Sequence, residues 1–139
     1  MSGFDPEQWL RVAEHCCRAA SGAEREAYLR TALNRAYYAT LLTAKRRIER
    51  ALGKGVIPRV RTHTTILEAI RSGGPQLQHI HQFLQQLKRL RERADYELNR
   101  LPVGRQRVYA KIWGSRAVIR TQIEALPDAE FRRLRIPDT

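Results

Sequence analysis

The sequence has little of what marks a secreted or membrane-spanning protein. It contains only two cysteines, adjacent at Cys16 and Cys17, which excludes a disulfide framework and a cysteine zinc site. It has no run of about 18 apolar residues that could span a bilayer, and residues 1–9 lack the basic and apolar parts of a signal peptide. We therefore expect a cytoplasmic protein that contacts no membrane.

Proline, glycine, aromatic and acidic residues are also scarce. Six Pro and eight Gly leave long stretches free of helix breakers, and the abundant Ala, Leu, Arg, Glu and Gln favour helices. The chain carries 26 Lys and Arg against 14 Asp and Glu, a formal net charge of +12, which favours a polyanionic partner. Aromatic residues make up only 7%, so the sequence gives little support for an extended base-stacking platform.

Helix start and stop signals predict four long helices and one short one. No stretch alternates between apolar and polar residues, so no strand is expected. The fold class is therefore all-α, an up-and-down bundle in one domain over residues 1–139, with a basic C-terminal tail from about residue 127. The first expected helix begins at Asp5-Pro6. The other four span residues 21–52, 62–71, 76–98 and 105–126.

One charged residue interrupts the apolar stripe of the helix over residues 76–98. The stripe comprises Leu77, Ile80, Leu84, Leu87, Ala94 and Leu98, and the member missing from the series is Arg91. Arginine is rarely buried unless it is paired, and Asp95 lies one helical turn further on. Two readings stay open: a structural ion pair at the edge of the core, or a cleft or dimer interface in which Arg91 meets a phosphate while Asp95 holds it.

The helix over residues 21–52 carries a double tyrosine, Tyr37-Tyr38, among small alanines that allow another helix to approach closely. Arg35 and Tyr38 share one side of this helix. They either pack at the edge of the core or form a second wall of the Arg91 cleft.

Two segments carry a family likeness. Residues 34–39 (NRAYYA) resemble a helix signature of HEPN-domain proteins, and residues 90–96 (LRERADY) resemble the LRxxADY signature of one subgroup. The resemblance covers roughly residues 21–126. It implies a HEPN-like bundle that forms a homodimer, with the two motif helices meeting across the dimer axis.

The resemblance also implies a function. Many relatives are metal-independent endoribonucleases of toxin–antitoxin or antiphage defence systems, and some are encoded beside a nucleotidyltransferase that acts as antitoxin. Their catalytic pattern is Arg, four to six residues, then His. Counted from Arg91, the corresponding positions hold Tyr96, Glu97 and Leu98, so the usual His is absent.

Metal-free RNA cleavage needs a base, an acid and a cation at the phosphate. Arg91 is the candidate cation, assisted by Arg35. The candidate proton carriers are His63 and Tyr96, and more weakly His79 and His81; His63 is otherwise a helix-start residue that packs against the bundle. HExxH, CxxC, P-loop and GxGxxG motifs are absent, so we expect no metal and no cofactor.

Basic residues cluster at the end of the second helix and along the last. Such clusters are often only solvated faces, but the net charge favours an RNA-backbone or acidic-partner surface. The predicted RNA contacts are Arg35, Tyr38, Arg46, Arg47, Arg59 and Arg61. Three hypotheses follow: an RNA-cleaving effector, a non-catalytic module that binds RNA, a nucleotide or a partner protein, and a structural subunit of a larger assembly.

Overall fold

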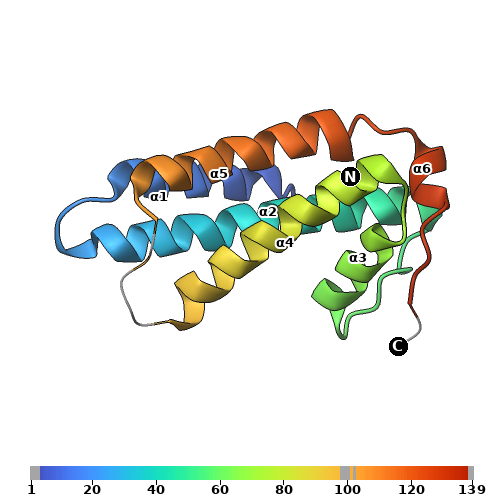
Figure 1. The fold of residues 1–139 in the computed structure, drawn as a ribbon, viewed down its shortest axis with the longest axis horizontal. Helices are drawn as coiled ribbons and strands as arrows, with labels where there is room; N and C mark the ends of the chain where they lie inside the picture. Colours follow the sequence, from blue (N-terminus) through green and yellow to red (C-terminus); the bar gives the residue numbers. More distant parts are fainter. Residues whose placement is uncertain (1–3, 98–100, 102, 138–139) are drawn as a thin grey trace.

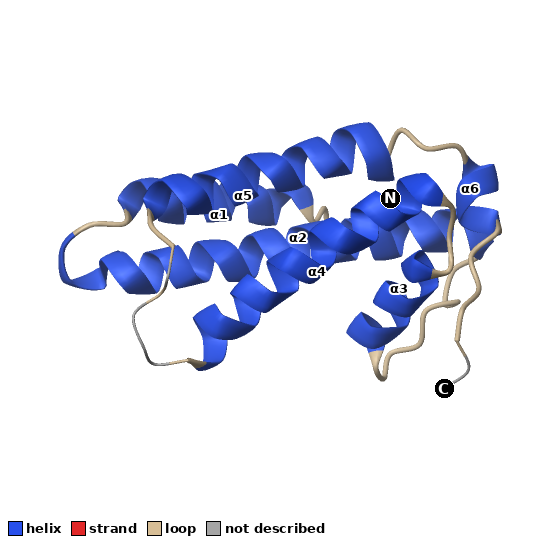
Figure 2. Ribbon diagram, viewed as in Figure 1, coloured by secondary structure: helices blue, strands red, loops and turns tan. Residues whose placement is uncertain are grey.

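The protein is a helical bundle in the computed structural model, which describes residues 4–97, 101 and 103–137. Within these ranges every regular element is a helix, and no strand is present (Figure 2). This confirms the all-α class. The elements are α1 (Glu7–Ala19), the short turn η1 (Gly22–Glu24), α2 (Arg25–Leu52), α3 (Thr62–Arg71), α4 (Pro75–Tyr96), α5 (Arg105–Val118), the π-helical turn η2 (Ile119–Ile123) and α6 (Asp128–Arg132).

The helix ends follow the local signals in the sequence. The Asp5 carboxylate accepts a hydrogen bond of 3.0 Å from the Glu7 amide, so it satisfies a free N–H at the start of α1. Helix α2 ends at Leu52 because Gly53 adopts a φ of 124°, which side chains disfavour. Helix α3 has the predicted bounds. Helix α4 ends at Tyr96, and Leu98 of the predicted stripe lies outside the described residues.

The last long helix differs from the prediction. It was expected to continue to Leu126, but α5 ends at Val118 and the chain widens into the π turn η2, where the Glu124 amide donates to the Ile119 carbonyl at 2.8 Å. The wider turn keeps Ile119 and Ile123 in the core, where they are 1% and 0% exposed. Pro127 then stops the helical path because it restricts the residue before it and lacks an N–H.

Helix α2 is the central element of the bundle. It packs against α1, α4, α5 and α6, and Figure 1 shows it running through the middle of the molecule. Its alanines Ala32, Ala36 and Ala39 are fully buried, so neighbouring helices approach its backbone closely. Among the helices of the described ranges, none is both long and apolar enough to cross a lipid bilayer.

The C-terminal segment packs onto α2 through α6 and the residues after it. Phe131 and Leu134 are 1% and 6% exposed. The Arg47 guanidinium lies 4.4 Å from the centre of the Phe131 ring, pairs with Asp128 at 2.6 Å and donates to the Leu126 carbonyl at 2.8 Å. Phe131 and Leu134 thus anchor the segment that its basic residues predict to be a tail.

Candidate functional site

Arg91 occupies the core-facing stripe of α4, as the spacing predicts. The residue is only 7% exposed, and its stripe neighbours Leu87 and Ala94 are 0% and 4% exposed. Burial of a guanidinium is costly unless charge and hydrogen-bonding partners surround it. The surroundings of Arg91 therefore define the first part of the site.

The Arg91 guanidinium is held by one carboxylate and three aromatic rings. Its Nη1 donates to Asp95 Oδ2 at 3.2 Å, and its Cζ lies 5.0, 5.8 and 6.0 Å from the ring centres of Tyr37, Tyr38 and Tyr96. Burial alone would lower the pKa of Arg91, but the hydrogen bond to Asp95 and the nearby tyrosines outweigh it, so the pKa is raised. Arg91 is a permanent cation, and its Nε has no hydrogen-bond partner among the described residues.

Asp95 also joins α4 to α2. The Asn34 side-chain amide donates to Asp95 Oδ2 at 3.0 Å and to Oδ1 at 3.3 Å. Arg35 in turn donates from Nε to Asn34 Oδ1 at 2.8 Å, and its Nη2 contacts the same oxygen. The two arginines are therefore connected through Asn34 and Asp95. Sequence reasoning did not select Asn34, although it begins the first motif segment.

Arg35 lies on an aromatic surface. Its Cζ is 4.7 Å from the centre of the Trp9 ring and 5.5 Å from that of Tyr38, and Trp9 contacts Phe4 at a centroid distance of 5.1 Å. The structure thus collects aromatic rings from α1, α2 and the end of α4 around two arginines. The sequence does not predict this aromatic cluster. Aromatic residues are few, and Phe4 and Trp9 are distant in sequence from the two motif segments.

His63, at the start of α3, faces the same tyrosine pair as Arg91. The centre of its ring is 5.2 Å from that of Tyr38 and 5.9 Å from that of Tyr37. Burial, followed by the positive charges of Arg91 and Lys88, lowers the pKa of His63. The imidazole is therefore neutral at neutral pH and able to accept a proton.

A hollow opens beside this cluster between α2 and α4. Its volume is about 560 Å³. Asp95 lines it and also accepts the hydrogen bond from Arg91. It is lined by Arg30, Thr31, Asn34, Arg35, Ala94 and Asp95. The recess is thus lined by two arginines, Arg30 and Arg35, and one carboxylate, Asp95, while Arg91 lies outside its lining and pairs with that carboxylate.

We name the residues Asn34, Arg35, Tyr37, Tyr38, His63, Arg91 and Asp95 the Arg91 cluster. Tyr37 is fully buried within it, and desolvation, only partly countered by Arg91, raises the pKa of Tyr37 to about 12. Its hydroxyl is therefore protonated at neutral pH. Tyr96 lies at the rim, 73% exposed, where its side chain can reach solvent.

The other predicted contacts lie apart from the Arg91 cluster. Arg59 and Arg61 are exposed at the approach to α3. Arg46 is exposed and pairs with Asp5 at 3.5 Å and Glu124 at 3.6 Å. Arg47 is 3% exposed and holds the C-terminal segment, a placement that favours a structural role over phosphate binding.

The remaining histidine candidates are on α4. His79 is exposed. His81 has a lowered pKa, because of burial and then the charge of Arg71, and it lines a separate hollow between α3 and α4. Across the described part of the chain, no three His, Cys, Asp or Glu side chains are grouped so that they could hold a metal ion.

Comparison with known proteins gives one match. The family model of the HEPN domain matches residues 6–118, a range that contains the whole Arg91 cluster and ends before η2 and α6. No curated protein and no solved structure shows significant similarity to the chain. The finer resemblance to an LRxxADY subgroup stays a prediction.

Proposed function

This chain belongs to the HEPN domain family, and from that premise we propose that it acts on RNA at the Arg91 cluster, as a metal-independent endoribonuclease. The resemblance found in the sequence extends the proposal to its setting, a homodimeric effector of a toxin–antitoxin or antiphage defence system. An operon-encoded nucleotidyltransferase or another defence protein is then the expected partner.

One observation carries the proposal. The family's usual His after the motif Arg is replaced by Tyr96, Glu97 or Leu98, depending on the spacing. His63 nevertheless lies against the same two tyrosine rings as Arg91. These contacts support His63, from α3, as the candidate for the histidine that the motif itself lacks.

The chemistry follows from the protonation states. Neutral His63 accepts the proton of the ribose 2′-hydroxyl, and the 2′-oxygen attacks the adjacent phosphorus. The bond to the 5′-oxygen breaks, and that oxygen takes up a proton, for which Tyr96 is the candidate donor. The products are a 2′,3′-cyclic phosphate and a 5′-hydroxyl. Arg35 and Arg91 stabilise the negative charge that develops on the phosphate oxygens.

A second candidate function is RNA binding without cleavage. It is favoured by the low exposure of Arg91, at 7%, and by its existing pair with Asp95. In that case the recess between α2 and α4 holds a phosphate through Arg35, and Arg91 serves to keep Asp95 and Asn34 in place. The chain would then act as a binding module for RNA or for a partner protein.

A cleavage assay with purified protein in EDTA tests the proposal. We expect the wild type to cut tRNA or mRNA, and His63→Asn to lower the rate by about 100-fold or more, as loss of a general base does. His79→Asn, which changes an exposed histidine outside the cluster, is the matched control and should cut at the wild-type rate.

Intact RNA over a wide range of protein concentration would contradict the endoribonuclease. If the same protein binds RNA with an affinity that falls steeply with salt, the second function replaces the first. If it neither binds nor cuts RNA, both are wrong.

A further inference from the structure

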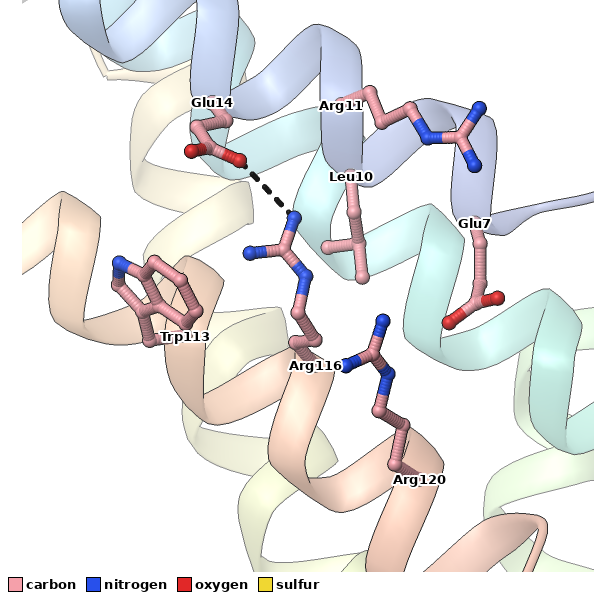
Figure 3. Close-up of a pocket in the computed structure, with 7 residues that line it drawn as sticks. All are labelled: Glu7, Leu10, Arg11, Glu14, Trp113, Arg116 and Arg120. Carbon is pink, nitrogen blue, oxygen red and sulfur yellow. Dashed lines mark hydrogen bonds and ion pairs between the residues drawn. The ribbon is translucent and has the colours of Figure 1, made fainter.

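A separate hollow lies between α1 and α5. Its volume is about 410 Å³, within the range of small-ligand sites. Figure 3 shows Arg116 of α5 and Arg120 of η2 reaching toward α1, with Trp113 at one side. It is lined by Glu7, Leu10, Arg11, Glu14, Trp113, Arg116 and Arg120, and none of these residues belongs to the Arg91 cluster.

The charges around this hollow leave two cations available. Glu14 pairs with Arg116 at 3.1 Å and also with Arg18, so two arginines already neutralise its negative charge. Within the described ranges, Arg11 and Arg120 have neither an ion pair nor a hydrogen bond to a side chain, and both are exposed. An anion that entered the hollow would find two unpaired guanidinium groups, those of Arg11 and Arg120, and also the carboxylate of Glu7, which has no ion pair among the described residues.

Trp113 gives the hollow an aromatic wall. Its side chain is 55% exposed, although tryptophan is usually largely buried. The Arg116 Cζ lies 4.7 Å from the centre of the ring, a cation–π contact. A large exposed ring that lines the same hollow as unpaired cations is a combination that single-stranded nucleic acid uses, because a base stacks on the ring while a phosphate meets the cations.

We propose that the hollow binds one nucleotide of a single-stranded RNA, with the base on Trp113 and the phosphate at Arg120 and Arg11. This inference rests on the proposed function for the identity of the polyanion. It adds a second RNA contact on a different pair of helices from the Arg91 cluster. The strand would then be held at two places, one of which takes no part in cleavage.

Fluorescence titration tests this directly. The chain has two tryptophans, so Trp9→Phe leaves Trp113 as the single reporter. The probe is a 2′-O-methyl oligoribonucleotide of about 12 nucleotides, a length suited to a single-strand site, which lacks the nucleophile needed for cleavage. We expect it to quench Trp113. Trp113→Ala in the otherwise wild-type chain should weaken binding about tenfold, the loss typical of one stacked base.

The cation is tested by Arg120→Gln. This variant should lower the slope of log affinity against log salt by about 0.7, the share of one single-strand phosphate contact. Arg133→Gln, which removes an exposed charge directly after α6 that does not line the hollow, and Tyr28→Ala, which removes an exposed ring, are the matched controls. Thermal unfolding of each variant checks that the fold is retained.

The outcomes separate this inference from the proposed function. If the protein binds or cuts RNA but Trp113→Ala and Arg120→Gln bind like wild type, the hollow is not an RNA site and the Arg91 cluster stands. If polyglutamate quenches Trp113 and the oligonucleotide does not, the hollow takes an acidic protein and the inference is wrong. If no RNA binds at all, the proposed function has failed first.

Discussion

The Asn34 side-chain amide donates to both carboxylate oxygens of Asp95, at 3.0 and 3.3 Å, and so joins α2 to α4. The same carboxylate accepts from Arg91 at 3.2 Å. Asp95 therefore has two functions: it neutralises a buried cation and it fixes the two helices that border the recess. Any change that removes its charge should be felt both in stability and in the position of Arg91.

Asp95→Asn should lower the free energy of unfolding by about 2 kcal/mol, because it leaves the buried guanidinium of Arg91 without its counter-charge. Urea unfolding measures the change. Glu97→Gln removes an acid directly after the same helix that pairs with Arg93 at the surface, with side chains 53% and 49% exposed. That control should stay within about 0.5 kcal/mol of the wild type. Equal effects of the two substitutions would contradict the role given to Asp95.

Arg47→Ala should lower the free energy of unfolding by about 2–3 kcal/mol, because it removes the Asp128 pair, the Leu126 hydrogen bond and the contact with Phe131. The neighbouring Arg46→Ala should cost less than about 1 kcal/mol, since its ion pairs are partly exposed. Thermal or urea unfolding compares the two. An Arg47 variant of wild-type stability that has lost RNA affinity would show that Arg47 contacts RNA after all.

The pH dependence of stability should report His63. Its pKa is lowered in the folded state by burial and by Arg91 and Lys88, while the rings of Tyr37 and Tyr38 lie against it. The unfolded chain therefore takes up the proton first as pH falls, and the free energy of unfolding should decrease below about pH 6.5. The stability that neutral His63 contributes is fully present above about pH 6.5. It is lost progressively as the pH falls toward the lower pKa of His63 in the folded state.

His63→Asn should flatten this decrease in part, since His81 also has a lowered pKa and contributes its own share. Histidine resonances followed by NMR give the site directly. A His63 titration midpoint at or above about 6.5 would show that the imidazole is not in the environment described here.

Local signals in the sequence were sufficient for most of the fold. Gly53 and the cap at Asp5 determine helix ends within a residue or two, because these effects act over one turn. The π turn after Val118 and the helix α6 could not be predicted in this way. They depend on Ile123 and Phe131 reaching the core, which is a property of packing against α2 rather than of local preference.

Only part of the site could be predicted from the sequence. Arg91 could be found because it breaks an apolar stripe, and Asp95 because it lies one turn away. The position of His63 beside Arg91 could not, since it depends on how α3 folds back onto α4 and α2. Asn34 begins the first motif segment, but nothing in its own position predicts a bond to an acid 61 residues away.

The central claim is that Arg91 and His63 form one catalytic site, and a double-mutant cycle tests it most directly. The rate constant for cutting one defined oligoribonucleotide in EDTA is measured for wild type, Arg91→Lys, His63→Asn and the double variant. Residues that act as one unit are strongly non-additive, so each single variant should lose about 100-fold or more and the double should be little worse. Losses that multiply in the double variant, or a wild type that leaves the RNA intact, would contradict the claim.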